Sequence, residues 1–396
     1  MRRLDLNKAI VARSDTIRDI NRLIVLNYVR EKAPISRAEI SQETALQRST
    51  VSLIVDELKS RGLIDEFEGE STGGRPPTLL QLRASAAIAI GVDLGTRSTV
   101  VATSDLAGHV LEESTFETDP DVKKTTRKIV NCAQEFMKRE RGIEGLGVSL
   151  PGLVDPKTGM AHFIPHFKWR EWRVAEELRR ATGLPVTVDN DANAAALAEL
   201  WFGRHEIRQV RDFIMVLVEA GLGTGLVFDG QIYHGMVGAA GEFGHMTIGK
   251  GAPVACAAGS RECWEAFASE RAALARYTQN SRQGNGSGLT FRTLVGNALN
   301  GDRVAKTALR ETSYYLGLGI SNLLKGLSPE AVIVGGAISR AWPIIGEELK
   351  NAVAENSICR GLPMARIIAS TLGENVTLMG ALSLVLASKF ASVHPA

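Results

Sequence analysis

The apolar positions near the N-terminus of the chain recur at helical spacing. Over residues 16–30 they share one face of a predicted first helix, at Ile17, Ile20, Leu23 and Ile24. A short second helix is predicted to begin at SRAE, where Ser36 can cap the helix and Glu39 can complete a capping box. The pattern therefore predicts two helices before a turn at residues 44–47.

A third helix is predicted over the sequence RSTVSLIVDELKSRG, residues 48–62. Gly62 stands where a helix C-terminus favours glycine, and the apolar stripe consists of Val51, Ile54, Val55 and Leu58. The next sequence, LIDEFEGESTGGRPPTLLQL, predicts two short strands around a glycine-rich tip at residues 73–76. Three helices followed by such a wing are typical of a winged helix-turn-helix domain.

Polar side chains on the other face of the third helix favour DNA binding. They lie near its N-terminal end, at Arg48, Ser49, Thr50 and Ser52. Short or forked donors there suit a recognition helix in the major groove, and Arg75 on the stiff wing tip suits a minor groove. The alternative is a packing module whose polar face is only solvated. Acidic residues in this domain oppose its positive charge, so a single copy should bind DNA weakly. A dimer would place two copies on a two-fold DNA site.

The sequence changes character after Arg83, which places the domain boundary between a winged helix-turn-helix domain at 1–82 and a second part at 83–396. Strands are predicted there at residues 86–95, 99–115 (two strands and a turn), 145–150, 185–190, 212–221, 224–233 and 331–336. Helices between most of them predict an α/β architecture with mixed sheets. Four glycine-rich turns close apolar strands, at DLGTRST, PGLVD, EAGLGTG and VGGAISR, and they predict a nucleotide-and-sugar-type cleft.

Composition adds few limits to this picture. The 396 residues are too many for one core, and a net charge of +2 gives no global basic excess for binding nucleic acid. No apolar stretch of about 18 residues occurs, and the acids in MRRLDLNKAIVARSD do not fit a signal peptide, so we expect a cytoplasmic protein with no membrane partner. The cysteines are too few for a disulfide framework, and only Cys256 and Cys263 suggest a shared site.

The order of motifs resembles the ROK family, which groups bacterial repressors and sugar kinases. It is most similar to the winged-helix transcriptional regulators of the xylose-repressor and N-acetylglucosamine-repressor kind. The resemblance covers nearly the whole chain and rests on STVSLIVDELKSRGLI, GGRPP, GVSLPGLVDPKTG, DNDANAAALAE, GAAGEFGHM, CAAGSRECWE and LSPEAVIVGG. It implies an actin-like ATPase fold, the ROK sugar-kinase-like fold, of two α/β lobes with a cleft between them.

The resemblance also implies which residues bind a sugar effector. The Asp of the NDAN motif, the base of the family's sugar kinases, matches Asp191; the other sugar-holding residues match Asn190, Glu242, His245 and Glu265. A neutral polyol needs several carboxylate and amide acceptors to replace its lost water. The alternatives are a helix N-cap for Asp191 and a solvated turn pair for Glu242 and His245. Trp169 and Trp172 are predicted to help shape the pocket.

The phosphate-binding loops depart from the kinase pattern. The first loop of the family is Asp-x-Gly-Gly-Thr-Lys, whereas this chain continues from Gly95 with Thr96, Arg97 and Ser98. The second is Gly-Thr-Gly, whereas this chain has Glu219, Ala220 and Gly221. Because phosphoryl transfer is mostly positioning and charge neutralisation, we interpret Asp191 as a clamp and expect neither catalysis nor ATP binding. A sugar kinase is the alternative.

The family also holds a structural zinc ion with the His of its ExGH motif and three cysteines in the pattern C-x-C-G-x-x-G-C. The match here runs from Cys256 to Cys263, with Ala258 in place of the second cysteine. Structural zinc is almost always four-coordinate, so His245, Cys256 and Cys263 leave one position open. Three outcomes compete: water or another side chain completes the site, the affinity falls, or the site is empty.

Together these features predict a sugar-responsive transcriptional regulator, a repressor of carbohydrate-use genes, that binds operator DNA as a homodimer or homotetramer. A sugar or sugar phosphate between the lobes would change their closure and so the spacing of the paired DNA-binding domains. Besides the kinase, the other alternative is a regulator controlled by a protein partner.

Overall fold

The N-terminal elements form a winged helix-turn-helix unit, which we call the head. The computed structural model describes residues 14–70, 76–208, 210–281, 288–357 and 364–391. The head contains α1 (Ser14–Lys32), β1 (Ile35–Ser36), α2 (Arg37–Thr44), α3 (Arg48–Ser60), β2 (Ile64–Glu68) and β3 (Thr78–Leu82). Its strands pair in the order β1-β3-β2. Residues 73–75 of the predicted wing tip, which include Arg75, lie outside the described residues.

The helix signals in the head are confirmed, with one difference. Ser36 and Glu39 make both hydrogen bonds of the predicted capping box, and the predicted stripe of α3 is buried. The apolar face predicted for α1 is not its buried face. Ile17, Ile20 and Ile24 are 37% to 50% exposed, whereas Val25 and Val29 are fully buried. The helix carries two apolar faces, and tertiary packing covers the one nearer its C-terminal end.

Two lobes follow the head and share one strand order. The first lobe contains η1 (Ala84–Ala86), β4 (Ile88–Leu94), β5 (Ser98–Asp105), β6 (Val110–Glu117), α4 (Val122–Arg139), β7 (Ile143–Leu150), β8 (Leu153–Asp155), β9 (Met160–Ile164), β10 (Trp169–Trp172), α5 (Val174–Thr182) and β11 (Val186–Asn190). Its main sheet runs β11-β7-β4-β5-β6, and β8 to β10 form a small separate sheet.

The second lobe repeats this topology. Its elements are α6 (Asp191–Phe202), α7 (His205–Arg208), β12 (Phe213–Val218), β13 (Leu222–Phe228), β14 (Gln231–Ile232), η2 (Glu242–His245), α8 (Trp264–Ala268), α9 (Glu270–Asn280), α10 (Phe291–Leu299), α11 (Arg303–Leu327), β15 (Ala331–Gly335), η3 (Ala337–Ala341), α12 (Trp342–Glu355), β16 (Arg366–Ala369), η4 (Gly373–Asn375), α13 (Val376–Leu386) and η5 (Ala387–Lys389). The sheet runs β14-β13-β12-β15-β16. Numbered within each lobe, both sheets have the order 3-2-1-4-5, with the first three strands antiparallel and the last two parallel to the first.

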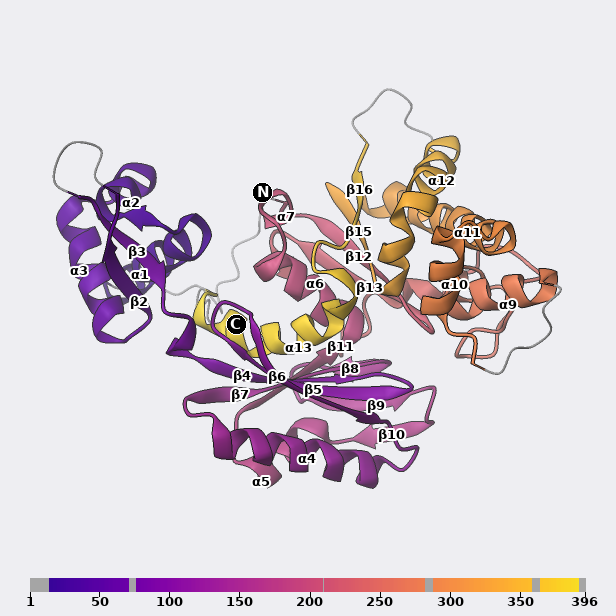
Figure 1. Cartoon of the computed structure of the whole chain (residues 1–396), viewed down its shortest axis with the longest axis horizontal. Coiled ribbons are helices and arrows are strands. Elements are labelled where there is room, and N and C mark those ends of the chain that lie inside the picture. The colour runs from indigo at the N-terminus through magenta and orange to yellow at the C-terminus, as the bar shows by residue number, and fades with distance from the viewer. Residues whose placement is uncertain (1–13, 71–75, 209, 282–287, 358–363, 392–396) are drawn as a thin grey trace.

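Helices α6 and α13 lie between the two sheets. Helix α13 packs on β4 and β7 of the first lobe and on α6, while α6 packs on β12 and β13 of the second lobe (Figure 1). Helices α4 and α5 cover the opposite face of the first sheet, and α9 to α12 that of the second (Figure 1). Alternate residues of β12 serve both sides: Ile214 belongs to the core under α9 to α12, and Met215 to the core under α6.

A buried carboxylate ties α6 to the segment after β16. Glu199 is 0% exposed. It accepts hydrogen bonds from the Ser370 hydroxyl at 2.6 Å, the Thr371 amide at 2.8 Å and the Thr371 hydroxyl at 2.7 Å. Charge-assisted hydrogen bonds to a buried carboxylate are strong, and removing the acceptor leaves buried donors unpaired.

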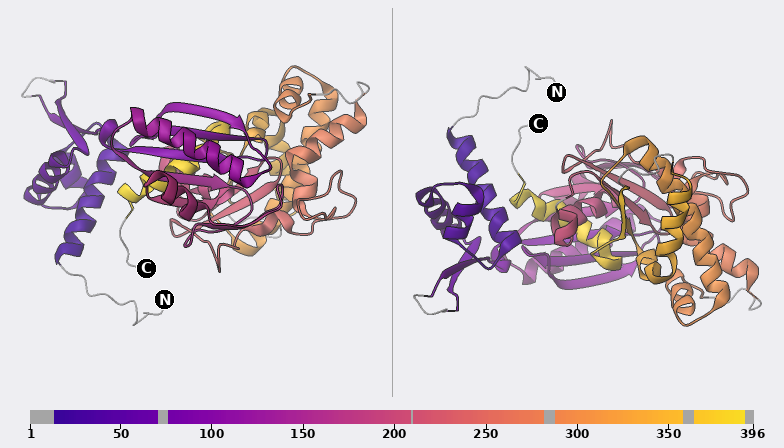
Figure 2. Two further views of the ribbon diagram at one scale, coloured as in Figure 1. Left: turned by 90° about the horizontal axis from the view of Figure 1, so that it is seen from below. Right: turned by 90° about the horizontal axis from the view of Figure 1, so that it is seen from above.

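The head contacts the lobes through the last turns of α1. The Arg30 guanidinium lies 4.7 Å from the ring centre of Trp201 on α6 and 4.8 Å from that of Phe390. Asn27 donates a hydrogen bond to the Phe390 carbonyl at 2.9 Å. Buried residues of the head and of α13 belong to one apolar cluster, so the head is not joined by a bare linker. Figure 2 shows the head at one end of the molecule, beside the lobes.

Replacing Glu199 with Ala is expected to lower the thermal unfolding midpoint of the full chain by about 5 °C, because three donors lose their acceptor. Differential scanning fluorimetry measures this midpoint. Glu355→Ala changes an exposed glutamate at the end of α12 and is expected to leave it within about 1 °C. Equal midpoints for the two variants would contradict the role of Glu199.

Candidate functional site

The turn between β11 and α6 places Asp191 at a helix start without making it the cap. Asn190 is the N-cap residue, and its side-chain oxygen accepts hydrogen bonds from the amides of Ala192 at 2.9 Å and Asn193 at 3.4 Å. The Asn190 side-chain amide donates to the Gly152 carbonyl at 3.0 Å. The N-cap alternative for Asp191 is therefore wrong, because the preceding asparagine fills that role.

Asp191 is held where α6 approaches β13 of the second lobe. A Cβ atom added at Gly225 would lie 2.4 Å from the Ala192 carbonyl oxygen, so only glycine allows this approach. The corresponding Cβ at Gly223 would lie 3.7 Å from the Asp191 carboxylate. Burial raises the pKa of Asp191 to about 7, and the carboxylates of Asp93 and Glu242 add to this shift. Gly223 and Gly225 of EAGLGTG thus allow close packing against α6.

Three carboxyl groups meet at the carboxyl ends of three strands. Asp93 lies near the end of β4, Asp191 follows β11, and Glu219 follows β12. Burial raises the pKa of Asp93 to about 6, although a hydrogen bond from Thr377 opposes this shift. Burial, with Asp93 and Asp191 nearby, raises the pKa of Glu219 well above its usual value. Any of these carboxyl groups that is ionised would repel a polyphosphate placed beside it.

The other residues predicted to bind the sugar occupy different settings. Glu242 and His245 lie on η2, and their closest side-chain oxygen and nitrogen are 3.9 Å apart. Glu265 is 5% exposed and has an internal role. It accepts hydrogen bonds from the Ala257 amide, the Arg271 guanidinium and the Leu222 amide at 2.7, 2.9 and 3.3 Å. Glu265 therefore ties the cysteine-bearing loop to β13.

Sequence reasoning missed a polar group beside Asn190. Asp189 is buried, and its carboxylate contacts His234 Nε2 at 2.8 Å and accepts a hydrogen bond from the Asn193 side chain at 3.1 Å. His234 precedes the loop that leads to η2, so this contact joins β11 to that loop. The sequence VDNDAN contains two aspartates, and only the second one, Asp191, starts the helix. The first one, Asp189, could therefore have been identified from the sequence as a further polar residue of the site.

The two tryptophans predicted to help shape the pocket are buried in the first lobe. Trp169 and Trp172 are 8% and 4% exposed and belong to the core of the first lobe. Their ring centres are 5.4 Å apart, and Trp169 Nε1 donates to the Pro120 carbonyl at 2.7 Å. These rings fasten β9 and β10 onto the lobe, which is why they present no open face to a ligand.

His245, Cys256 and Cys263 come together as the metal motif predicts. One ligand atom from each residue lies within 4.8 Å of the other two. The two cysteines are 4% and 6% exposed, and His245 Nδ1 is buried without a hydrogen-bond partner among the described residues. A buried unpaired imidazole nitrogen beside two thiols suits a thiophilic divalent metal ion such as zinc. Burial raises the pKa of the Cys263 thiol when no metal is bound.

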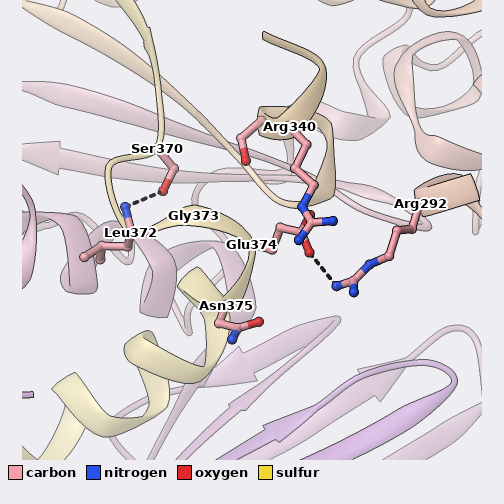
Figure 3. A pocket seen from close by; sticks show the side chains of 8 residues that line it. Arg292, Arg340, Ser370, Leu372, Gly373, Glu374 and Asn375 are labelled. Atoms are coloured by element: carbon pink, nitrogen blue, oxygen red, sulfur yellow. Dashed lines mark hydrogen bonds and ion pairs between the residues drawn. The ribbon is translucent and has the colours of Figure 1, made fainter. Parts of the chain in front are cut away.

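A cavity of about 460 Å³ lies on the second lobe, next to the start of α13. It is lined by Arg292, Ser339, Arg340, Ser370, Leu372, Gly373, Glu374 and Asn375. Figure 3 shows Glu374 between the two arginines, and it forms ion pairs with both. The carboxylate therefore neutralises part of the positive charge that this cavity would otherwise offer to an anion.

The outward face of α3 combines the predicted donors with an apolar residue. Arg48 and Ser49 are exposed, while Thr50 and Ser52 are half-buried. Leu53, which sequence reasoning missed, is 72% exposed in the middle of this face. An apolar side chain on a recognition helix can contact a thymine methyl group. The sequence could have indicated this exposure, because Leu53 does not fall at the helical spacing of the buried residues of α3.

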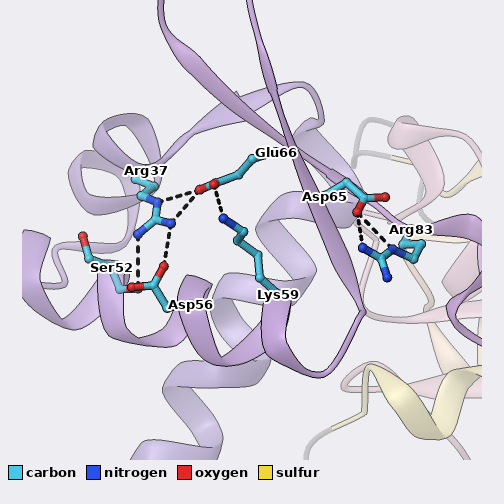
Figure 4. Close-up of polar contacts among 7 residues, drawn as sticks. All are labelled: Arg37, Ser52, Asp56, Lys59, Asp65, Glu66 and Arg83. Atoms are coloured by element: carbon cyan, nitrogen blue, oxygen red, sulfur yellow. Dashed lines mark hydrogen bonds and ion pairs between the residues drawn. The ribbon is translucent and has the colours of Figure 1, made fainter.

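Ion pairs hold this face in place on the head. Figure 4 shows Arg37, the first residue of α2, donating to Asp56 on α3 at 2.7 Å and to Glu66 on β2 at 2.6 Å. Glu66 also pairs with Lys59, and Asp65 pairs with Arg83. The Arg37 hydrogen bond holds the pKa of Asp56 below its usual value. These ion pairs neutralise part of the acidic charge close to the outward face of α3, which would approach the phosphates of DNA.

Comparisons with known proteins cover both parts of the chain. A model of the ROK family matches residues 89–388, and a model of winged helix-turn-helix DNA-binding domains matches residues 18–65. The chain is 32% identical over 386 residues to the xylose repressor of Caldicellulosiruptor bescii, covering 93% of this chain and 96% of that protein. Among the described residues, no helix is both long and apolar enough to cross a membrane.

Solved structures agree with this match. A ROK family transcriptional regulator, a homologue of the E. coli MLC protein, has a TM-score of 0.75 at 26% identity, covering 96% of this chain and 98% of that one. A ROK family glucokinase from Streptomyces griseus, in complex with glucose and AMPPNP, has a TM-score of 0.69 at 28% identity, covering 76% of this chain and 99% of that one. The part of this chain that the glucokinase does not cover is about as long as the head. By its sequence match and its two-lobed fold with a winged helix-turn-helix head, the chain belongs to the ROK family.

Proposed function

We propose that this protein is a sugar-responsive transcriptional repressor. Residues 1–82 would bind operator DNA, and residues 83–396 would bind a sugar or sugar phosphate. The observation that carries this proposal is the match to a xylose repressor over 93% of this chain, which includes both the head and the two lobes. The repressor would act as a homodimer or homotetramer, because one acid-diluted head offers little affinity by itself.

The effector would bind at the start of α6, with Asp191 as its central acceptor. A carboxylate at that point can accept hydrogen bonds from two sugar hydroxyl groups. Glu242 and His245 would contribute from η2. Asn190 and Glu265 would also line the site, but their side chains already make internal hydrogen bonds that orient it.

Phosphoryl transfer is the second candidate function, because the fold also matches a glucokinase. The arrangement of acids argues against it. Asp93 and Asp191 also belong to the kinase pattern, but Glu219 replaces the first glycine of the second phosphate loop, and its carboxyl group lies near both aspartates. We therefore propose that Asp191 holds the sugar without deprotonating it for transfer.

Helix α6 offers a route from effector to head. Its first residue is Asp191, and Trp201 in its last turn packs on Arg30 of α1. Ten residues of helix place these ends about 15 Å apart. A sugar that prefers one position of α6 would thereby also favour one position of the head.

Operator binding and its effector can be tested together. In mobility shifts with DNA upstream of the protein's own gene and of neighbouring sugar-use genes, a specific complex is expected that one member of a panel of free and phosphorylated sugars alters. Arg48→Ala is expected to weaken this complex roughly tenfold. Arg141→Ala, at an exposed arginine of the first lobe, serves as the control. No specific complex at moderate salt would contradict the repressor proposal.

The role of Asp191 has a pH signature. Because its pKa is about 7 in the free protein and the proposed clamp is ionised, sugar affinity measured by calorimetry is expected to fall roughly eightfold from pH 7.5 to pH 6.0. The stability of the free protein changes with pH in the opposite direction. The raised pKa shows that folding favours the protonated form of Asp191. The contribution of Asp191 to stability is therefore present at low pH and is lost as the pH rises through 7.

Asp191→Asn is expected to weaken sugar binding and to flatten its pH dependence. ATP with magnesium is expected to leave the bound sugar unphosphorylated. Steady sugar-dependent ADP release that Asp191→Asn abolishes would instead support the kinase.

Coupling through α6 is tested at Trp201. Trp201→Ala removes the ring that contacts Arg30, and it is expected to preserve sugar binding while reducing the sugar-induced change in DNA affinity at least threefold. Trp201→Phe keeps an aromatic face and is expected to retain most of that change. Full coupling in the alanine variant, measured by fluorescence anisotropy of labelled operator DNA, would exclude this route.

A further inference from the structure

The loop between β14 and η2, residues 233–241, belongs to the second lobe but contacts the first lobe at two places. His234 Nε2 lies 2.8 Å from the Asp189 carboxylate at the end of β11. A Cβ atom added at Gly238 would lie 1.8 Å from the Val154 carbonyl oxygen on β8, so the backbone of the loop packs directly on that strand. The loop therefore joins the two lobes beside the proposed sugar site.

The loop is also fixed to the second lobe near its start and at its end. The Tyr233 amide donates a hydrogen bond to the Leu226 carbonyl at 2.8 Å, and the Thr224 hydroxyl donates one to the Gly241 carbonyl. Between these points Val237 has a φ of 51°, in the left-handed region that β-branched residues rarely adopt. Such a backbone persists where the surrounding contacts determine it, so these contacts define the course of the loop.

Asp189 joins this loop to the turn that starts α6. One carboxylate oxygen accepts hydrogen bonds from the Asn190 amide at 2.8 Å and from the Asn193 side chain at 3.1 Å, and the other faces His234. An ionised carboxylate can only accept, so His234 Nε2 carries the hydrogen of this contact. The Asp189 side chain is only 6% exposed, and hydrogen bonds to a buried carboxylate are strong.

We infer that His234 is a positioning residue of the sugar site. Through Asp189 it holds Asn190, at the end of β11 in the first lobe, against η2 of the second lobe. Helix η2 carries Glu242 and His245. The inference rests on the proposed function, because it requires that a sugar binds these residues. It goes beyond that proposal by giving a role to a histidine that orients the site while its Nε2 is engaged by Asp189.

The contact between His234 and Asp189 affects sugar binding through preorganisation. A polyol is bound tightly only when several polar groups converge on it at once. When the two halves of the site are not held together, a sugar must order them as it binds, and affinity is lost. Asp189 also holds the start of α6, so replacing it would disturb more than this contact. His234 is therefore the residue to test.

Two variants of similar side-chain length separate the hydrogen bond from the volume of the ring. His234→Gln keeps an N–H donor, whereas His234→Met has none. Calorimetry on the full chain uses a panel of free and phosphorylated pentoses, hexoses and N-acetylhexosamines. Binding of the sugar that the natural chain prefers is expected to be about tenfold weaker in His234→Met and to stay within about twofold in His234→Gln.

Met236→Ala is the control for a general disturbance of the loop. Met236 lies two residues from His234 and is 83% exposed. This variant is expected to bind the sugar as the natural chain does, because the contacts with the first lobe remain.

Hydrogen exchange tests the contact without any ligand. In the sugar-free protein, the backbone amides of residues 233–241 are followed by mass spectrometry. Their exchange is expected to be at least roughly threefold faster in His234→Met and unchanged in His234→Gln.

The outcomes separate the inference from the proposed function. Equal exchange in the natural chain and in His234→Met would show that the contact does not hold the loop, and the inference would be wrong. Faster exchange with unchanged sugar affinity, or equal losses of affinity in both variants, would reduce the contact to a support of the fold and would also overturn it. If no sugar of the panel binds the natural chain, the proposed function fails and the positioning role fails with it, while the exchange data still report the contact itself.

Discussion

The structure depends on one buried helix, α6, that two sheets and a second helix enclose. Its alanines permit close packing on every side, since Ala192 meets the glycines of β13 and Ala194 meets Gly380 of α13. Close packing of small residues leaves little room to move one neighbour without the others. The N-cap at Asn190 and the buried Glu199 hold the helix near its two ends.

This placement gives α6 access to several parts of the protein. Its first turn carries Asp191 into a group of carboxyl groups drawn from both lobes. Its last turn carries Trp201 to the head. The same helix therefore contacts residues of both lobes and of the head.

Local rules in the sequence predicted the head well. The capping box of α2 and the buried stripe of α3 depend on residues three or four positions apart, so the sequence contains them directly. The principal strands of both lobes were also predicted from apolar runs that end at glycines. Strands β8 to β10 and β16 were not, because they are short and pair with neighbours that periodicity does not identify. The ROK resemblance, which rested on motif order, was confirmed by the comparisons.

The sequence by itself determined the order of the parts: a winged helix-turn-helix, then strand-and-helix lobes whose turns carry acids and glycines. Tertiary structure alone decided which of two apolar faces of α1 is buried, that Trp169 and Trp172 belong to a core, and that Asp189 pairs with His234. It also decided that Arg30 meets Trp201 across 171 positions of sequence. Such contacts join residues far apart in the chain, and spacing along the sequence carries information only about near neighbours.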